Sequence, residues 1–158
     1  MVYRGDLKKR GIEMPEQKST GDLLEVLKKK GSYEEAQREI CTGQYTVNLS
    51  EYLHTLARER NMKQADILRR SGLKKSYFYL LMDGRREKPS RDTLIQLGFG
   101  YGLSLDEMQE FLKHLGAAQL YPRIARDGVV IYALQHGLDI IRCDILLEEN
   151  GEQPLVRE

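Results

Sequence analysis

Apolar residues in the middle of the chain recur three and four positions apart, the spacing that puts side chains on one face of an α-helix. Leu53, Leu56 and Ala57 follow this pattern directly after Asn48 and Glu51. Asn is a favoured helix cap, and an acidic residue in the first turn suits the positive end of the helix dipole. A helix is therefore predicted to begin at about residue 48.

Four further helices are predicted downstream, each bounded by a cap or a glycine. The second covers about Lys63 to Arg70 and the third about Lys75 to Met82, and they end at Gly72 and Gly84. The fourth begins after Pro89-Ser90, and the fifth begins with a capping box of Ser104 and Glu107. Their inward residues are predicted to be Ala65, Leu68, Phe78, Leu81, Leu94, Leu97, Met108, Phe111, Leu112 and Leu115.

The C-terminal third repeats the preceding segment at an offset of 35 residues. Arg91-Asp92 matches Arg126-Asp127, and Gly102, Gly116 and Leu120 match Gly137, Gly151 and Leu155. Each copy has the pattern of a helix, a glycine turn, a second helix and a glycine stop. Repeated units of this kind bury their apolar faces on a neighbour. A helical hairpin over residues 122–158 is therefore predicted to pack on the bundle, and a twin in a second chain is the alternative neighbour.

The N-terminal region has weaker signals. Its first twenty or so residues contain few large apolar groups and are predicted to be flexible. Short helices are plausible at Gly21–Lys30 and at Ser32–Glu39. The predicted organisation is thus a flexible tail with a short helical extension (1–46), a helical bundle (47–121) and the C-terminal hairpin (122–158). The predicted fold class is all-α.

Composition adds few constraints on function. The chain has 158 residues, of which 41% are apolar and 31% charged, and no apolar run of eighteen residues. A membrane span and a signal peptide are not predicted, so a cytoplasmic protein is expected. Cys41 and Cys143 are expected to be reduced thiols. The three histidines are scattered, and no spacing typical of a metal site or catalytic triad occurs. No metal, cofactor or enzymatic activity is predicted.

The distribution of charge indicates a nucleic-acid partner more strongly than the net charge of +1 does. Between Arg58 and Arg91 there are eleven basic and four acidic residues, a net charge of +7, whereas the rest of the chain carries −6. One positive segment on an acidic body is typical of a protein that turns one face to phosphate.

The segment from Lys63 to Phe78 has the pattern of a helix-turn-helix. It reads KQADILRRSGLKKSYF. The small Ala65 lies near its start, Gly72 permits a tight turn, Leu73 follows as an apolar plug, and Phe78 anchors the second helix. A short rigid turn sets two helices at a fixed angle, so that the second can enter a major groove while the first crosses the phosphates.

From Leu49 to Leu115 the chain resembles the phage-repressor-like helix-turn-helix family, also called XRE-like. The residues that carry the resemblance are Gln64, the Ser71-Gly72-Leu73 turn, the Asp83-Gly84-Arg85-Arg86 helix end, Pro89-Ser90 and the run from Gly102 to Glu107. The resemblance implies a five-helix bundle, with Gln64, Lys75, Ser76 and Tyr79 facing base edges and Arg85 and Arg86 on phosphate. Lys74, Tyr77 and Lys88 complete the candidate DNA-binding set. The chain departs from the family at Lys74, where a small polar cap is usual.

The sequence is compatible with two functions. The first is a sequence-specific regulator that binds double-stranded DNA, predicted to act as a homodimer on a two-fold site. The second is an adaptor that keeps the fold and binds a protein through Tyr77, Phe78, Tyr79 and the C-terminal hairpin. The N-terminal extension is a further candidate surface for a protein partner.

Overall fold

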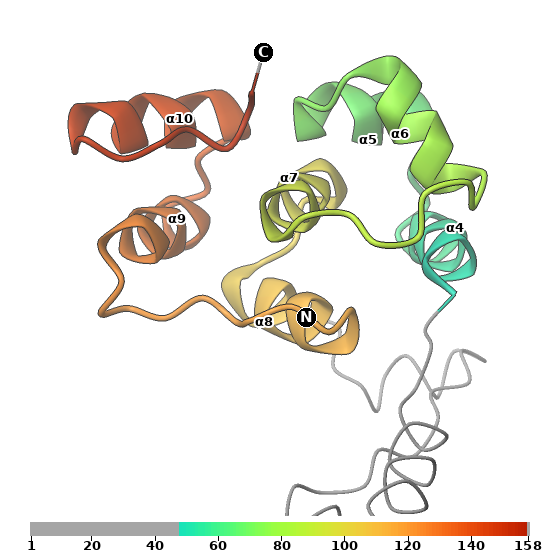
Figure 1. Cartoon of the computed structure of the whole chain (residues 1–158), viewed down its shortest axis with the longest axis horizontal. Helices are drawn as coiled ribbons and strands as arrows, with labels where there is room; N and C mark the ends of the chain where they lie inside the picture. The colour runs from blue at the N-terminus through green and yellow to red at the C-terminus, as the bar shows by residue number, and fades with distance from the viewer. Residues whose placement is uncertain (1–47, 158) are drawn as a thin grey trace, which may run out of the picture.

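The computed structural model describes residues 48–157, which form seven helices and no strand. The predicted N-terminal helices and Cys41 lie outside the described residues. Figure 1 shows the arrangement. The helices are α4 (Leu49–Glu59), α5 (Gln64–Ser71), α6 (Lys75–Met82), α7 (Arg91–Tyr101), α8 (Leu105–His114), α9 (Ala125–Gln135) and α10 (Ile140–Glu149).

The helix boundaries follow the predicted caps closely. The side chain of Asn48 accepts a hydrogen bond from the N–H of Glu51, and that of Ser90 accepts one from Thr93. Ser104 and Glu107 form the complete capping box at the start of α8. These caps satisfy donors that a helix start otherwise leaves unpaired, and the all-helical class and the five helices of the bundle are confirmed.

One predicted core position is wrong. Ala65 is exposed, whereas Ile67, two residues later, is completely buried. Two residues correspond to about 200° around a helix, so the two side chains lie on opposite sides of α5. The side that faces α7 carries Ile67 and the buried Ser71.

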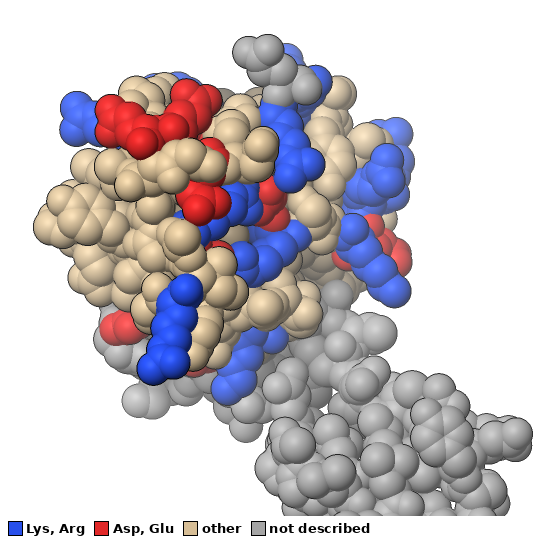
Figure 2. All heavy atoms as spheres, turned by 60° about the vertical axis from the view of Figure 1, so that its left-hand side comes forward, with Lys and Arg blue, Asp and Glu red and all other residues tan. Residues whose placement is uncertain are grey.

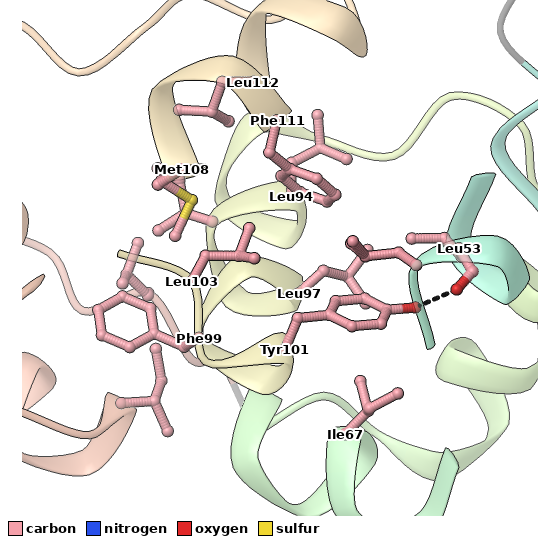
Figure 3. Packing of buried hydrophobic residues seen from close by; sticks show 14 of the residues in the cluster. Leu53, Ile67, Leu94, Leu97, Phe99, Tyr101, Leu103, Met108, Phe111 and Leu112 are labelled. Carbon is pink, nitrogen blue, oxygen red and sulfur yellow. Dashed lines mark hydrogen bonds between the residues drawn. The ribbon is translucent and has the colours of Figure 1, made fainter. Parts of the chain in front are cut away.

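Helix α7 is the centre of the bundle. Its nine residues from Thr93 to Tyr101 are all buried, which is typical of a helix surrounded on every side. Figure 3 shows Leu94, Leu97 and Tyr101 among the buried side chains of its neighbours. The Tyr101 hydroxyl donates a hydrogen bond of 2.8 Å to the carbonyl oxygen of Leu53 in α4. This bond satisfies a polar group that would otherwise destabilise the core.

Two glycines allow the neighbours of α7 to approach closely. A Cβ atom added at Gly100 would lie 2.7 Å from the carbonyl oxygen of Ile67 in α5, and one added at Gly98 would overlap the end of Met108 in α8. This part of α7 is thus a close packing site, and it is followed by a left-handed turn at Gly102.

The C-terminal hairpin of α9 and α10 packs on the bundle through residues that the 35-residue repeat relates. The guanidinium of Arg91 binds both carboxylate oxygens of Asp127, at 2.9 and 2.8 Å. The guanidinium of Arg126 binds both oxygens of Asp92, at 2.7 and 3.0 Å. The two copies therefore exchange the same Arg-to-Asp contact.

Further contacts within each copy also correspond at an offset of 35. Arg91 donates to the carbonyl oxygens of Ala118 and Gln119, and Arg126 donates to those of Gln153 and Pro154. Gln109 accepts from the N–H of Leu120, as Asp144 does from that of Leu155. The repeat read from the sequence is confirmed as a structural one.

The exchanged contacts give the two copies an approximate two-fold relation. When residue i of one unit contacts residue j of the other and j contacts i in return, the pair is isologous. Figure 1 agrees, because α8 lies below α7 while α10 lies above α9, so the two hairpins face in opposite directions. The second copy of the repeat therefore packs against the first copy in an approximately two-fold arrangement.

In residues 48–157 no helix has both the length and the apolar character needed to cross a bilayer.

Gly100→Ala is expected to destabilise the protein by about 1–3 kcal/mol, because the new methyl group would overlap the backbone of α5. The matched control is Gly128→Ala in α9, where the nearest atom to the added Cβ is the carbonyl oxygen of Pro122 at 3.4 Å. Without the overlap, alanine should stabilise the helix by about 0.5–1 kcal/mol. Chemical denaturation measures both values, and the same sign for both variants would contradict the close approach of α5 and α7.

Stability is expected to fall in acid through Asp127. Burial alone would raise the pKa of this carboxyl, but the hydrogen bonds from Arg91 and from the N–H of Tyr121 outweigh it and hold the pKa below its usual value. A group with a lowered folded-state pKa stabilises fully above its unfolded pKa of about 4, and that contribution is lost as the pH falls through the folded value.

The free energy of unfolding should therefore decrease between about pH 5 and pH 2, and less steeply in Asp127→Asn. Glu87→Gln removes a carboxylate from the exposed loop before α7 and is the control. Parallel stability–pH curves for the wild type and Asp127→Asn would show that this carboxylate is not linked to folding.

Candidate nucleic-acid interface

The turn between α5 and α6 has a defined geometry. Helix α5 ends at Gly72, whose φ of 70° is left-handed and favours glycine. The hydroxyl of Ser71 donates to the carbonyl oxygen of Leu68 and accepts from the N–H of Leu73, at 2.8 and 3.2 Å. The amide of Gln96 in α7 donates to the carbonyl oxygen of Ser71. These bonds fix the direction of α6 relative to α5 and α7.

The C-terminal segment covers this turn. A Cβ atom added at Gly72 would lie 2.7 Å from Val156 and 3.7 Å from Ile140. Gly72 is therefore required for space as well as for its backbone conformation. The sequence carries no local signal for this contact, because Val156 lies 84 positions after Gly72.

The start of α6 presents polar side chains to solvent. Lys74, Lys75 and Ser76 are exposed, while Phe78, Leu81 and Met82 are buried on the opposite side. Tyr77 and Tyr79 are partly buried against the core, and the ring of Tyr79 meets that of Phe78 edge to face at 5.3 Å. Gln64 is partly buried at the start of α5.

The far end of α6 is attached to α4. The carbonyl oxygen of Met82 accepts a hydrogen bond from the hydroxyl of Ser50 and lies 2.9 Å from Nε2 of His54. Sequence reasoning missed this role of His54, which no periodicity reveals. Helix α6 is therefore held at both ends, by these bonds at its end and by the turn at its start.

A basic loop follows α6. Arg85, Arg86 and Lys88 are all exposed, and Arg85 forms an exposed ion pair of 3.0 Å with Asp83. An exposed pair of this kind contributes little stability and can exchange for a phosphate. The basic loop and the exposed start of α6 lie next to each other along the chain.

Neither helix of the motif begins with a side-chain cap. Lys63 and Lys74 occupy the cap positions of α5 and α6, and neither makes a capping hydrogen bond. The first N–H groups of a helix attract anions, and an uncapped start leaves them available to a phosphate oxygen. The lysine at each start adds a positive charge at the same place.

Two residues of the basic segment are internal and do not face a partner. Arg91 is the ion-pair partner of Asp127 described above. Arg60 donates to the carbonyl oxygens of Tyr101 and Gly102 and pairs with Glu107 at 2.7 Å. Burial would raise the pKa of Glu107, but the N–H of Ser104 and the charge of Arg60 outweigh it and lower the pKa. Figure 2 shows Lys and Arg side chains along the right-hand edge, with others at the centre and at the lower left of this face.

Residues 48–111 match a family model described as "Helix-turn-helix domain". This part of the chain is a helix-turn-helix domain. The match is consistent with the resemblance to the XRE-like family, and it ends within α8. No curated protein and no solved structure matches the chain. Helix-turn-helix domains bind DNA and are typically non-enzymatic.

Metal and thiol chemistry find no support within residues 48–157. No group of three or more His, Cys, Asp or Glu side chains in this region could hold a metal ion. Cys143 is buried in the core, and burial raises the pKa of its thiol to about 12. The thiol therefore remains protonated and acts as a small apolar side chain.

Proposed function

We propose that the chain is a sequence-specific transcriptional regulator that inserts α6 into the major groove of double-stranded DNA. The observation that carries the proposal is the orientation of α6 in the helix-turn-helix domain. Its apolar side is buried while Lys74, Lys75 and Ser76 are exposed at its start. In domains of this type, the N-terminal residues of the second helix contact base edges.

The proposed contacts divide into two groups. Lys75 and Gln64 have side chains that can bond guanine or adenine edges, with Ser76 and Tyr79 beside them. Lys74, Arg85, Arg86 and Lys88 would bind phosphate, which attracts DNA of any sequence. Tyr77 is proposed to contact the DNA backbone through its hydroxyl while its ring packs against the core.

The adaptor alternative has less support where it relies on an aromatic face. Phe78 is completely buried, and Tyr77 and Tyr79 are partly covered by the core. The part of that alternative that involves the C-terminal hairpin is not affected by this observation.

The proposed regulator is a homodimer, because one helix-turn-helix module binds DNA with modest affinity and a two-fold site doubles the contacts.

Selection of bound duplexes from a random pool tests the function directly. A regulator should enrich a defined sequence, and the two-fold symmetry of that sequence would report a dimer. Enrichment of no sequence, together with binding that does not depend on salt, would contradict DNA recognition by this domain.

Lys75→Ala is expected to lower affinity for the selected site by about 1–3 kcal/mol while nonspecific binding stays nearly unchanged. Lys75 is exposed in the first turn of α6, so its loss removes no packing. Lys113→Ala removes the same charge from an exposed position on α8 and is the control. Fluorescence anisotropy with specific and random duplexes measures both; an equal loss on the two would assign Lys75 to phosphate.

Replacing Arg85 and Arg86 together by Ala is expected to weaken binding to every sequence. It should also reduce the slope of log affinity against log salt by about two units, since two phosphate contacts are lost. The double Lys variant keeps both charges and should retain most of the slope. An unchanged slope in the Ala variant would mean that DNA does not pass over this loop.

A further inference from the structure

Within the part of the chain that the structure describes, the exposed large apolar side chains all lie in the C-terminal hairpin and the segment before it. In residues 48–157 they are Tyr121, Ile124, Tyr132, Ile141 and Ile145. Tyr132 is partly covered by its own chain, because its ring stacks on that of His136 with centroids 4.0 Å apart. Ile141 and Ile145 are 67% and 51% exposed. The apolar surface with no such cover therefore includes a stripe on α10.

The two isoleucines are one helical turn apart and share one face of α10. The opposite face carries the buried Ile140, Cys143 and Leu147. Figure 1 shows α10 at the edge of the molecule, with α9 below it. The face of Ile141 and Ile145 points away from the bundle.

The charges on this exposed face oppose the helix dipole. Arg142 lies in the first turn of α10, and Glu148 and Glu149 lie in the last turn; all three are exposed. Acidic groups are stabilising at a helix start and basic groups at a helix end, so each of these charges is in the unfavourable position. Among the described residues, none of the three forms an ion pair.

The same arrangement becomes favourable when α10 lies antiparallel to a second α10. With a two-fold axis at Ile145, the residue three positions before it faces the residue three positions after it in the partner. Arg142 then lies at the same level along the helix axis as the partner's Glu148, and this relation occurs twice because the interface is isologous. The partner's Glu149 lies beside the same guanidinium, and Ile145 packs against its own counterpart.

We propose that the exposed face of α10 pairs antiparallel with α10 of a second copy of this chain. The interface has an apolar centre at Ile141 and Ile145 and flanking ion pairs between Arg142 and the partner's Glu148 and Glu149. Figure 2 shows acidic side chains gathered at the upper left of this side of the molecule, with a basic side chain beside them. The proposal rests on the proposed function in that it names the surface that makes the regulator a dimer.

The location of α10 connects this interface to DNA binding. Ile140 and Val156 lie against Gly72, the turn that leads into α6. A partner bound to the outer face of α10 is therefore held by a segment that itself packs against the turn of the helix-turn-helix. Two recognition helices would be held at one separation, as a two-fold DNA site requires.

The test measures the mass of the full chain by sedimentation equilibrium, with charge-reversed variants. The wild type is expected to be a dimer at micromolar concentration. Arg142→Glu places like charges opposite each other twice and should weaken the dimer at least about tenfold. The same effect is expected for the pair Glu148→Arg and Glu149→Arg. Combining all three changes restores opposite charges and should restore most of the dimer.

Two controls separate interface from folding. Arg142→Glu puts an acid in the first turn of α10, where the dipole favours it, so the thermal melt of the dilute monomer should not fall. Arg123→Glu reverses an exposed charge before α9 and should leave the mass unchanged. A monomeric wild type, or a dimer that neither Arg142→Glu nor Ile145→Asp weakens, would overturn the proposal.

Binding to a short duplex with a single half-site distinguishes failure of the proposed interface from failure of the proposed function. If the interface is as proposed, Arg142→Glu binds the half-site as the wild type does but loses affinity for the full two-fold site. A dimer that dissociates as expected but binds neither duplex would contradict the DNA-binding proposal and leave the interface standing.

Discussion

The close contact between α5 and α7 at Gly100 is the constraint on which the helix-turn-helix depends. Nine consecutive residues of α7 are buried, so this helix must be enclosed by neighbours on every side. With no side chain at position 100, the backbone of α5 can approach to the distance at which Ile67 and Ser71 fill the space beside it. Gln96 then bonds to the residue before the turn, and the direction of α6 follows from the position of α7.

The second copy of the repeat, the hairpin of α9 and α10, is joined to the first copy by a matching pair of arginine contacts. Arg91 and Arg126 each bind two backbone carbonyls of their own copy and the aspartate of the other copy. A planar guanidinium has enough donors to make all these contacts at once, whereas a lysine ammonium does not. The bidentate pairs align the starts of α7 and α9. They also explain how a chain with an internal repeat forms a closed pair of hairpins and not an open stack.

The positive charge of the segment from Arg58 to Arg91 is only partly available on the surface of the protein. The segment from Arg58 to Arg91 carries +7, but Arg60 and Arg91 serve the internal structure. The other arginines of the segment are exposed on α4 and α5 and in the loop after α6, and the lysines at the starts of α5 and α6 are exposed as well. A basic segment therefore supplies both the ion pairs that hold the domain together and the groups proposed to meet phosphate.

Much of the fold could be predicted from local sequence because its signals act within one or two helical turns. Asn48, Ser90 and Ser104 bond to N–H groups three residues away, Gly72 and Gly102 adopt backbone conformations that other residues resist, and the repeat is visible as matched pairs. The candidate site could be predicted to the level of the turn and the exposed start of α6. Tertiary structure decided the rest: that Ile67 and not Ala65 faces the core, that Val156 covers Gly72, and that Arg91 pairs with Asp127. Each of these outcomes depends on which distant segments meet, and burial and ion pairing are determined by that meeting and not by the residues on either side in the chain.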